Sequence, residues 1–285
     1  MARNCGISIA FWFVLAAVYS YFVRGHSGFN KYFVVIGMAT VVWFGALTIY
    51  GARYKLRDWS ARRRMARGER PHDGDLVAAT GPIHAAFEPL HAPFSGRECV
   101  VYEYEIGPRR TGESNQARDY IGYGMTRCSV RTKNGEFALG SFPMMEHFFE
   151  TPVDRRAAFD YIANTPFEEL SGVIGTVKTM MSVHTTAPPL RKDWKVGDGG
   201  GSDPETADVI EKIIAPGETV TAFGRWVAGS SAIVSDTKEK GFLRVQRGGD
   251  AQQVPAMPWA AIGSVIGGAV VIAVAHFVFF GVISG

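Results

Sequence analysis

Three apolar stretches without a single Asp, Glu, Lys or Arg constrain this chain most strongly. They cover residues 7–23, 32–50 and 259–284. An α-helix rises about 1.5 Å per residue, so about 20 apolar residues cross the roughly 30 Å hydrocarbon core of a bilayer. We therefore expect three transmembrane helices, as a helical hairpin in domain 1–52 and a single C-terminal helix in domain 258–285. A cleaved signal peptide is the alternative for the first stretch, although only Arg3 precedes it and no small-residue cleavage site follows.

An arginine-rich juxtamembrane segment, residues 53–71, follows the second apolar stretch. It contains eight Lys and Arg residues against Asp58 and Glu69. Positive residues beside a membrane helix resist translocation, which predicts a cytoplasmic location for the following domain. Four arginines of this segment are also candidates for contact with the anionic headgroups of the lipid bilayer: Arg62, Arg63, Arg64 and Arg67. We expect no nucleic acid partner.

The domain 72–257 alternates short apolar runs with glycine, proline and asparagine, a pattern typical of β-strands and turns. Lys133, Asn134 and Gly135 separate two apolar runs, which predicts a β-hairpin. The runs near residue 80 and at 221–228 resemble each other loosely, so we expect two small β modules that pack together. The predicted fold class is α+β: a β-rich soluble domain held by three transmembrane helices.

A helical insertion is expected at about residues 144–214. Thr-Pro pairs at 151 and 165 precede segments that predict helices over 152–162 and 166–181. Three glycines make 198–202 a flexible joint. A further short helix is expected after Pro204, because Ile210, Ile213 and Ile214 recur at helical spacing.

The chain carries few signs of catalysis or metal binding. Its three cysteines are too scattered for a zinc module, and we expect Cys99 and Cys128 to be buried thiols. The seven histidines are dispersed, so no metal and no cofactor are expected. His276 lies in the third apolar stretch, where a hydrogen bond to a neighbouring helix is the expected role and a proton relay or ligand contact the alternative.

The segment 92–105 combines a turn with a strand. Pro93 and Gly96 predict the turn, and the residues that follow alternate between apolar and acidic side chains. We interpret Ser95 and Arg97 as parts of this structural turn. The alternative is an enzyme or enzyme subunit whose site is assembled in three dimensions around Ser95, Arg97 and His91.

Gly263 and Gly267 form a GxxxG motif in the third apolar stretch. This spacing allows close approach of another helix backbone in lipid. Transmembrane packing through this pair is expected, either within the chain or in a homo-oligomer.

The segments at 76–105 and 211–226, followed by a membrane helix, make the chain similar to the GIDE domain, also called the BAM domain. The matching residues are Gly81, Pro82, Pro93, Ser95, Gly96, Arg97, Cys99, Tyr102, Glu103, Pro216, Gly217, Glu218 and Gly224. The resemblance spans about residues 73–280. It implies a membrane-adjacent domain with a binding surface formed by Ser95, Gly96, Arg97, Cys99, Tyr102 and Glu103.

Eukaryotic members of this family are E3 ubiquitin ligases whose transfer activity depends on a zinc-binding RING after the last membrane helix. Here no cysteine follows Cys128, so the chain resembles a prokaryotic inner-membrane member without the RING. We expect no enzyme activity. The expected function is recruitment of a protein partner, or sensing, at the membrane surface.

Overall fold

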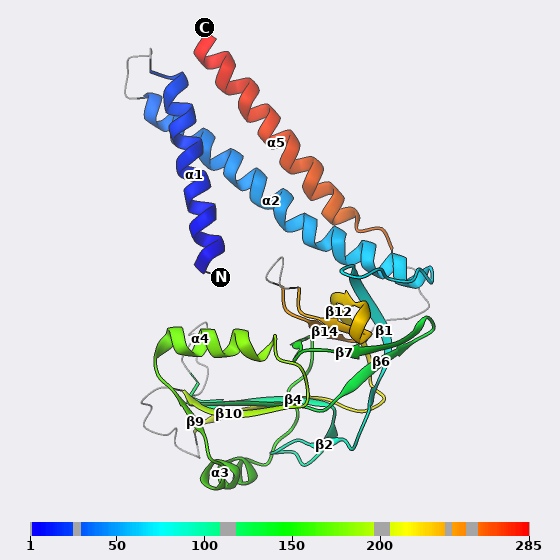
Figure 1. Cartoon of the computed structure of the whole chain (residues 1–285). Helices are drawn as coiled ribbons and strands as arrows, with labels where there is room; N and C mark the ends of the chain where they lie inside the picture. The colour runs from blue at the N-terminus through cyan, green and yellow to red at the C-terminus, as the bar shows by residue number, and fades with distance from the viewer. Residues whose placement is uncertain are drawn as a thin grey trace. The chain divides into compact units, whose positions relative to one another are not determined.

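The computed structural model describes residues 2–24, 30–108, 118–196, 206–236, 241–248 and 256–284. The chain divides into two compact units (Figure 1). The first, the helical unit, comprises Met1–Ser60 and Pro255–Gly285. The second, the β-rich unit, comprises Ala61–Val254.

The helical unit is built from α1 (Ala2–Phe22), the greater part of α2 (Asn30–Ala66) and α5 (Trp259–Ser284). Its core contains Tyr19, Ala39 and Phe279, one from each helix. Helices α2 and α5 approach most closely at Gly45 and Gly268. A Cβ atom on Gly45 would lie 2.7 Å from Cγ1 of Ile272, so these two glycines allow the helix backbones to come together.

Among the residues that the structure describes, two helices are long and apolar enough to cross a membrane: Tyr32–Ala66 within α2 and Trp259–Gly281 within α5. The expectation of three membrane-spanning helices is therefore wrong. Helix α1 is not among them: its apolar stretch, over the residues whose side chains are described, is Ala10–Phe22.

A closed barrel of five strands forms one half of the β-rich unit. Its strands are β1 (Leu76–Ala85), β6 (Cys128–Thr132), β7 (Gly135–Leu139), β13 (Ala232–Val234) and β12 (Thr219–Val227), in that order around the ring. The β7–β13 pair is parallel and the other pairs are antiparallel. Strands β14 (Arg244–Arg247) and β8 (Met144–Glu146) extend the sheet beyond β12.

The barrel closes because β1 changes partner along its length. Its residues from Leu76 to Pro82 pair with β12, and those from Ile83 to Ala85 pair with β6. Gly81 lies at this crossing, where a Cβ atom would be 1.9 Å from the carbonyl oxygen of Arg131. No side chain fits there, which accounts for glycine at the bend.

A second sheet forms the other half of the β-rich unit. Its strand order is β11 (Asp208–Ile214), β4 (Val101–Gly107), β5 (Tyr120–Met125), β10 (Leu190–Val196) and β9 (Glu168–Leu170). Helix α3 (Arg155–Asn164) covers one face and helix α4 (Gly172–Val183) lies over the other (Figure 1). A short hairpin of β2 (Leu90–His91) and β3 (Glu98–Cys99) precedes β4, and the short helix η1 (Ala228–Ser230) joins β12 to β13.

The expected α+β class is confirmed, as is the hairpin at Lys133–Gly135, which joins β6 to β7. Of the three helices expected within 144–214, the first two are present as α3 and α4, although both begin later than expected, and the third is wrong. Residues 168–170 form strand β9, and the segment with Ile210, Ile213 and Ile214 is strand β11. Strand β11 is buried on both faces, with Ile213 in one core and Ile214 in the other, and this imitates helical spacing. The expected joint at 198–202 lies outside the described residues.

Candidate functional site

The predicted turn at 92–97 is a tight loop between β2 and β3. The amide of Ala92 donates to the carbonyl of Arg97 over 2.9 Å, and the amide of Gly96 donates to the carbonyl of Ala92 over 3.0 Å. Gly96 has φ +67°, a left-handed conformation that side chains rarely adopt. Gly96 and Arg97 are exposed at the tip.

A buried carboxylate fixes this loop from below. Glu211 on β11 has no exposed surface. Its two oxygens accept hydrogen bonds from the backbone amides of Phe94, at 2.8 Å, and of Ser95, at 3.1 Å. Burying a carboxylate is costly unless its charge is compensated by hydrogen bonds of this kind. The loop is therefore a preorganised surface feature.

The six residues implied by the family resemblance do not form one surface. Ser95, Gly96 and Arg97 lie in the loop, whereas Cys99 and Tyr102 are buried beneath it in the core that includes α3. Burial, and next the charge of Glu211, raises the pKa of the Cys99 thiol to about 12.

The sixth residue, Glu103, lies on the opposite face of the second sheet, because side chains alternate along β4. Its Oε1 is 3.0 Å from Nζ of Lys212. Burial raises the pKa of the Glu103 carboxyl, and the neighbouring ammonium opposes that shift.

The geometry around Ser95 does not resemble a nucleophile with its base. Ser95 Oγ accepts a long hydrogen bond from the amide of Arg97, at 3.5 Å. Both oxygens of the adjacent carboxylate, Glu211, are already engaged by backbone amides. His91 is exposed on β2, where its backbone pairs with Glu98. Among the described residues, no histidine is hydrogen-bonded to Ser95.

A polar cluster on the α3 face of the second sheet was missed by the sequence analysis. The Oδ1 atom of Asp193 accepts hydrogen bonds from the hydroxyl of Tyr104, at 2.5 Å, and from that of Tyr161, at 3.0 Å. Arg191 donates to the Tyr161 hydroxyl over 2.6 Å. Burial, and next the bond to Asp193, raises the pKa of Tyr104. These residues lie on β4, α3 and β10, and no motif in the sequence links them.

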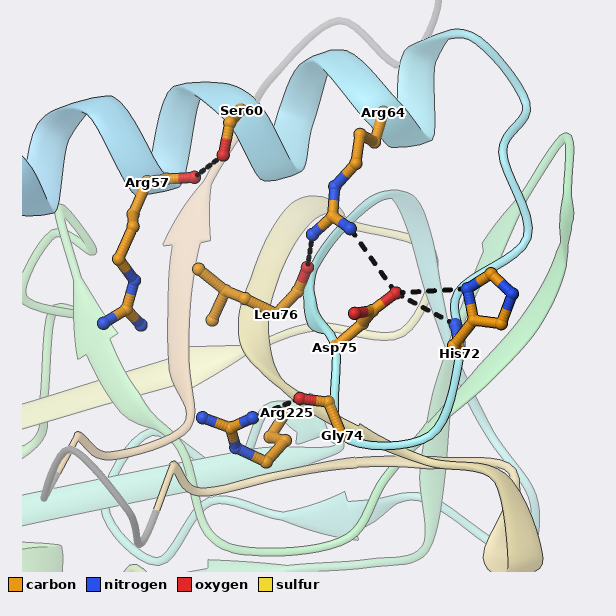
Figure 2. A network of polar contacts seen from close by, with 8 residues as sticks. All are labelled: Arg57, Ser60, Arg64, His72, Gly74, Asp75, Leu76 and Arg225. Atoms are coloured by element: carbon orange, nitrogen blue, oxygen red, sulfur yellow. Dashed lines mark hydrogen bonds and ion pairs between the residues drawn. The ribbon is translucent and has the colours of Figure 1, made fainter.

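Two of the four arginines expected to face lipid, Arg62 and Arg64, make contacts within the β-rich unit. Arg62 donates to the side chain of Gln246 over 2.5 Å, and its guanidinium lies 4.8 Å from the centre of the Phe223 ring. Arg64 donates to the carbonyl of Leu76 over 2.9 Å (Figure 2). Arg63 is half-buried and Arg67 is exposed. A role of this cluster in lipid binding stays a prediction.

Asp75 is the centre of the polar network in Figure 2. Its Oδ2 atom is 3.4 Å from the Arg64 guanidinium and accepts the amide of His72 over 3.0 Å. A cavity of about 410 Å³ lies beside this network. The cationic and anionic side chains on its walls balance each other, Arg64 and Arg70 against Glu69 and Asp75. The cavity therefore favours neither an anion nor a cation.

His276 bonds a neighbouring helix, as expected. Its Nδ1 atom lies 2.8 Å from the carbonyl oxygen of Ile272, and its Nε2 atom lies 2.9 Å from the hydroxyl of Tyr19 on α1. A carbonyl can only accept, so Nδ1 carries the proton and Nε2 accepts from the tyrosine. Gly263 and Gly267 take no part in packing within the described helices, since a Cβ atom on either would meet nothing within 4 Å. A homo-oligomer through this pair stays a prediction.

Comparison with known proteins supplies no relative: no family model, no curated protein and no solved structure matches the chain. Cys99 and Cys128 are buried free thiols, as expected. Over the described ranges, no group of three His, Cys, Asp or Glu side chains is placed to hold a metal ion.

Proposed function

We propose that this chain is a non-enzymatic integral membrane protein that presents its β-rich unit at the membrane surface to recruit a protein partner. The unit lies in the chain between α2 and α5, the two helices long and apolar enough to cross a membrane. The arginine-rich segment 53–71 favours the cytoplasmic side of a prokaryotic inner membrane. The similarity to the GIDE domain, a membrane-adjacent binding domain, agrees with this function.

The observation that carries the recruitment role is the fixed loop at 92–97. A fully buried carboxylate, Glu211, holds the loop in one shape, although the tip itself contacts solvent. A loop that loses little conformational freedom on binding gives a higher affinity than a mobile one. Gly96, Arg97 and Glu98 are exposed at this tip and form one part of the proposed contact surface.

Crosslinking in intact membranes tests the recruitment role. A photoreactive amino acid replaces Arg97, and the matched control replaces Arg131, which is also exposed but lies on the barrel. We expect one saturable adduct from position 97 and none from 131. Glu211→Gln, which leaves one loop amide without a carboxylate oxygen, should reduce the adduct several-fold. Equal adducts at both positions, or no effect of Glu211→Gln, would contradict the proposal.

Reporter fusions test the membrane topology separately. Fusions after Arg70 and after Pro255 should both report the cytoplasm, because α2 and α5 enclose the β-rich unit in the sequence. A fusion at Gly285 should report the exterior. An exterior result at Arg70 would contradict the orientation that the arginine-rich segment favours.

A further inference from the structure

Helix α4 has its apolar stripe on the side that faces away from the second sheet. Ile174, Val177 and Met181 recur at positions i, i+3 and i+7 and share one face of the helix. Their side chains are 85%, 51% and 48% exposed. On the opposite side, Val183 is buried against the second sheet. The outer face of α4 is therefore more apolar than a surface helix normally allows, because such a helix turns its apolar stripe to the core.

Two exposed aromatic side chains of the β-rich unit, Phe87 and Phe149, each lie near a cation. The Arg127 guanidinium lies 5.7 Å from the centre of the Phe87 ring, and that of Arg247 lies 5.1 Å from the Phe149 ring. The stripe on α4 contains no aromatic ring and therefore makes no contact of this kind. The single charged residue of α4 is Lys178, beside the stripe, and the helix contains no Asp or Glu.

We propose that α4 lies in the surface of the lipid bilayer, with Ile174, Val177 and Met181 among the upper acyl chains and Lys178 at the anionic headgroups. Interfacial helices bury an apolar face by about 5–10 Å and carry Lys or Arg on their polar side. With 12 residues, α4 is too short to cross the bilayer. The inference rests on the proposed membrane anchoring and adds a second contact to it.

Two observations favour lipid over a protein at this stripe. The β-rich unit continues at each end into a helix able to cross a membrane, so the bilayer is present at a high effective concentration. A stable protein interface buries about 800 Å² on each partner, which one stripe of three side chains does not supply. Insertion into lipid needs no complementary shape, and the flexible side chain of Met181 suits it.

Fluorescence quenching in lipid nanodiscs tests the proposal. The full chain with Cys5→Ser receives one added cysteine, Ile174→Cys or Met181→Cys, labelled with a fluorophore sensitive to polarity. Cys99 and Cys128 are buried and remain unlabelled. The matched control is Ala163→Cys, an exposed position on α3. Nanodiscs contain phosphatidylglycerol and phosphatidylcholine, with or without bromine on the acyl chains.

Brominated lipid should quench the probes at 174 and 181 at least threefold more than the probe at 163. Ile174→Glu should abolish quenching at 181, whereas Ala163→Glu should not. Both positions are exposed, so neither variant should alter the fold. Equal quenching at 174 and 163 would overturn the proposal. A probe at 174 that is shielded from water but not quenched by bromine would also overturn it, since a protein would then cover the stripe.

A separate experiment, extraction of native membranes with alkaline carbonate, tests the proposed membrane anchoring by itself. If alkaline carbonate released the chain from native membranes, α2 and α5 would not be membrane helices. Retention of the chain in the membrane, together with an unquenched probe at 174, would remove only the role of α4.

Discussion

Helices α3 and α4 cover opposite faces of the same sheet in different ways. In α3 the N-cap side chain of Asp154 accepts the amide of Arg156 over 2.9 Å, and Ala158 is fully buried. Tyr161 of α3 packs at 5.8 Å between ring centres against Tyr104 of the sheet. In α4 the N-cap residue Ser171 makes no side-chain capping bond, and the apolar stripe points outward.

The helix on one face of the sheet buries its apolar side chains, whereas the helix on the other face leaves a row of them exposed. The α3 face places its apolar and aromatic groups inside and satisfies its carboxylate, Asp193, with two tyrosines. The α4 face leaves a row of apolar side chains in contact with water unless something external covers it. We therefore expect stability to depend on the α3 face and contact with the membrane surface to depend on the α4 face.

The largest effect is expected for a charge beneath α3. Ala158→Glu would bury a carboxylate without a partner, which should cost about 3–5 kcal/mol of unfolding free energy. Chemical denaturation of the chain in detergent, followed by tryptophan fluorescence, measures this loss. The control Ala163→Glu, exposed on the same helix, should change the unfolding free energy by less than about 0.5 kcal/mol. Similar midpoints for both variants would break the comparison.

Removing one hydroxyl from each face should give a smaller contrast. Tyr104→Phe on the α3 face loses a hydrogen bond to Asp193 and should destabilise the chain by about 1.5–3 kcal/mol. Tyr123→Phe is the control on the α4 face, where the described residues provide no hydrogen bond to the hydroxyl; it should cost less than about 0.5 kcal/mol. An equal loss of unfolding free energy for both variants, measured by the same denaturation, would show that the hydrogen bond to Asp193 does not stabilise the α3 face.

The end of α4 should be sensitive to acid. His184 lies between the rings of Phe142 and Phe242, at 5.6 and 4.7 Å between ring centres. Burial lowers the pKa of His184, and its bond to the Phe142 carbonyl opposes this shift. The unfolded chain, with a histidine pKa of about 6.5, then binds the proton more readily than the folded chain. Stability should fall as the pH drops below about 6.5.

His184→Gln tests this assignment, because the variant lacks the titrating group and should show a flatter decline over the same pH range. Thermal unfolding of both proteins between pH 7.5 and pH 5 makes the comparison. Parallel declines would show that other groups cause the acid sensitivity.

The smallest effect concerns thiol reactivity. Burial raises the pKa of Cys99 and of Cys128 to about 12, so both thiols are protonated at pH 8 and lie out of reach of reagents. Iodoacetamide should modify neither in the folded chain and both in guanidinium, as counted by mass spectrometry. In detergent, Ile174→Cys on the outer face of α4 should react within minutes. Rapid modification of the Cys99 thiol in the folded chain would contradict its burial in the core beneath α3.

Local patterns predicted local structure well. The hairpin at Lys133–Gly135 and the turn at 92–97 follow from residues that are adjacent in the sequence. The start of α3 shows the limit of such patterns. Thr151 was expected to cap a helix that begins at Pro152, but its amide donates a hydrogen bond to the backbone carbonyl of Glu211 over 2.7 Å, and the helix begins three residues later, at Arg155.

Contacts between residues far apart in the sequence could not be predicted from the sequence. Glu211 contacts the amide of Ser95 across 116 positions, and Asp193 contacts Tyr104 across 89. No spacing rule connects such residues, because the strand order of the sheet sets their distance. The direction of the α4 stripe was likewise hidden. A periodic apolar pattern gives the same signal whether the stripe faces the core or faces outward.

The accessibility of a spin label at residue 174 tests the central claim most directly. Molecular oxygen concentrates in acyl chains and a nickel chelate stays in water, so their collision rates with the label report its surroundings. In nanodiscs with phosphatidylglycerol, the account predicts that oxygen outpaces the chelate at position 174 and that the chelate outpaces oxygen at position 163. A label at 174 that collides with the chelate as often as one at 163 would contradict it.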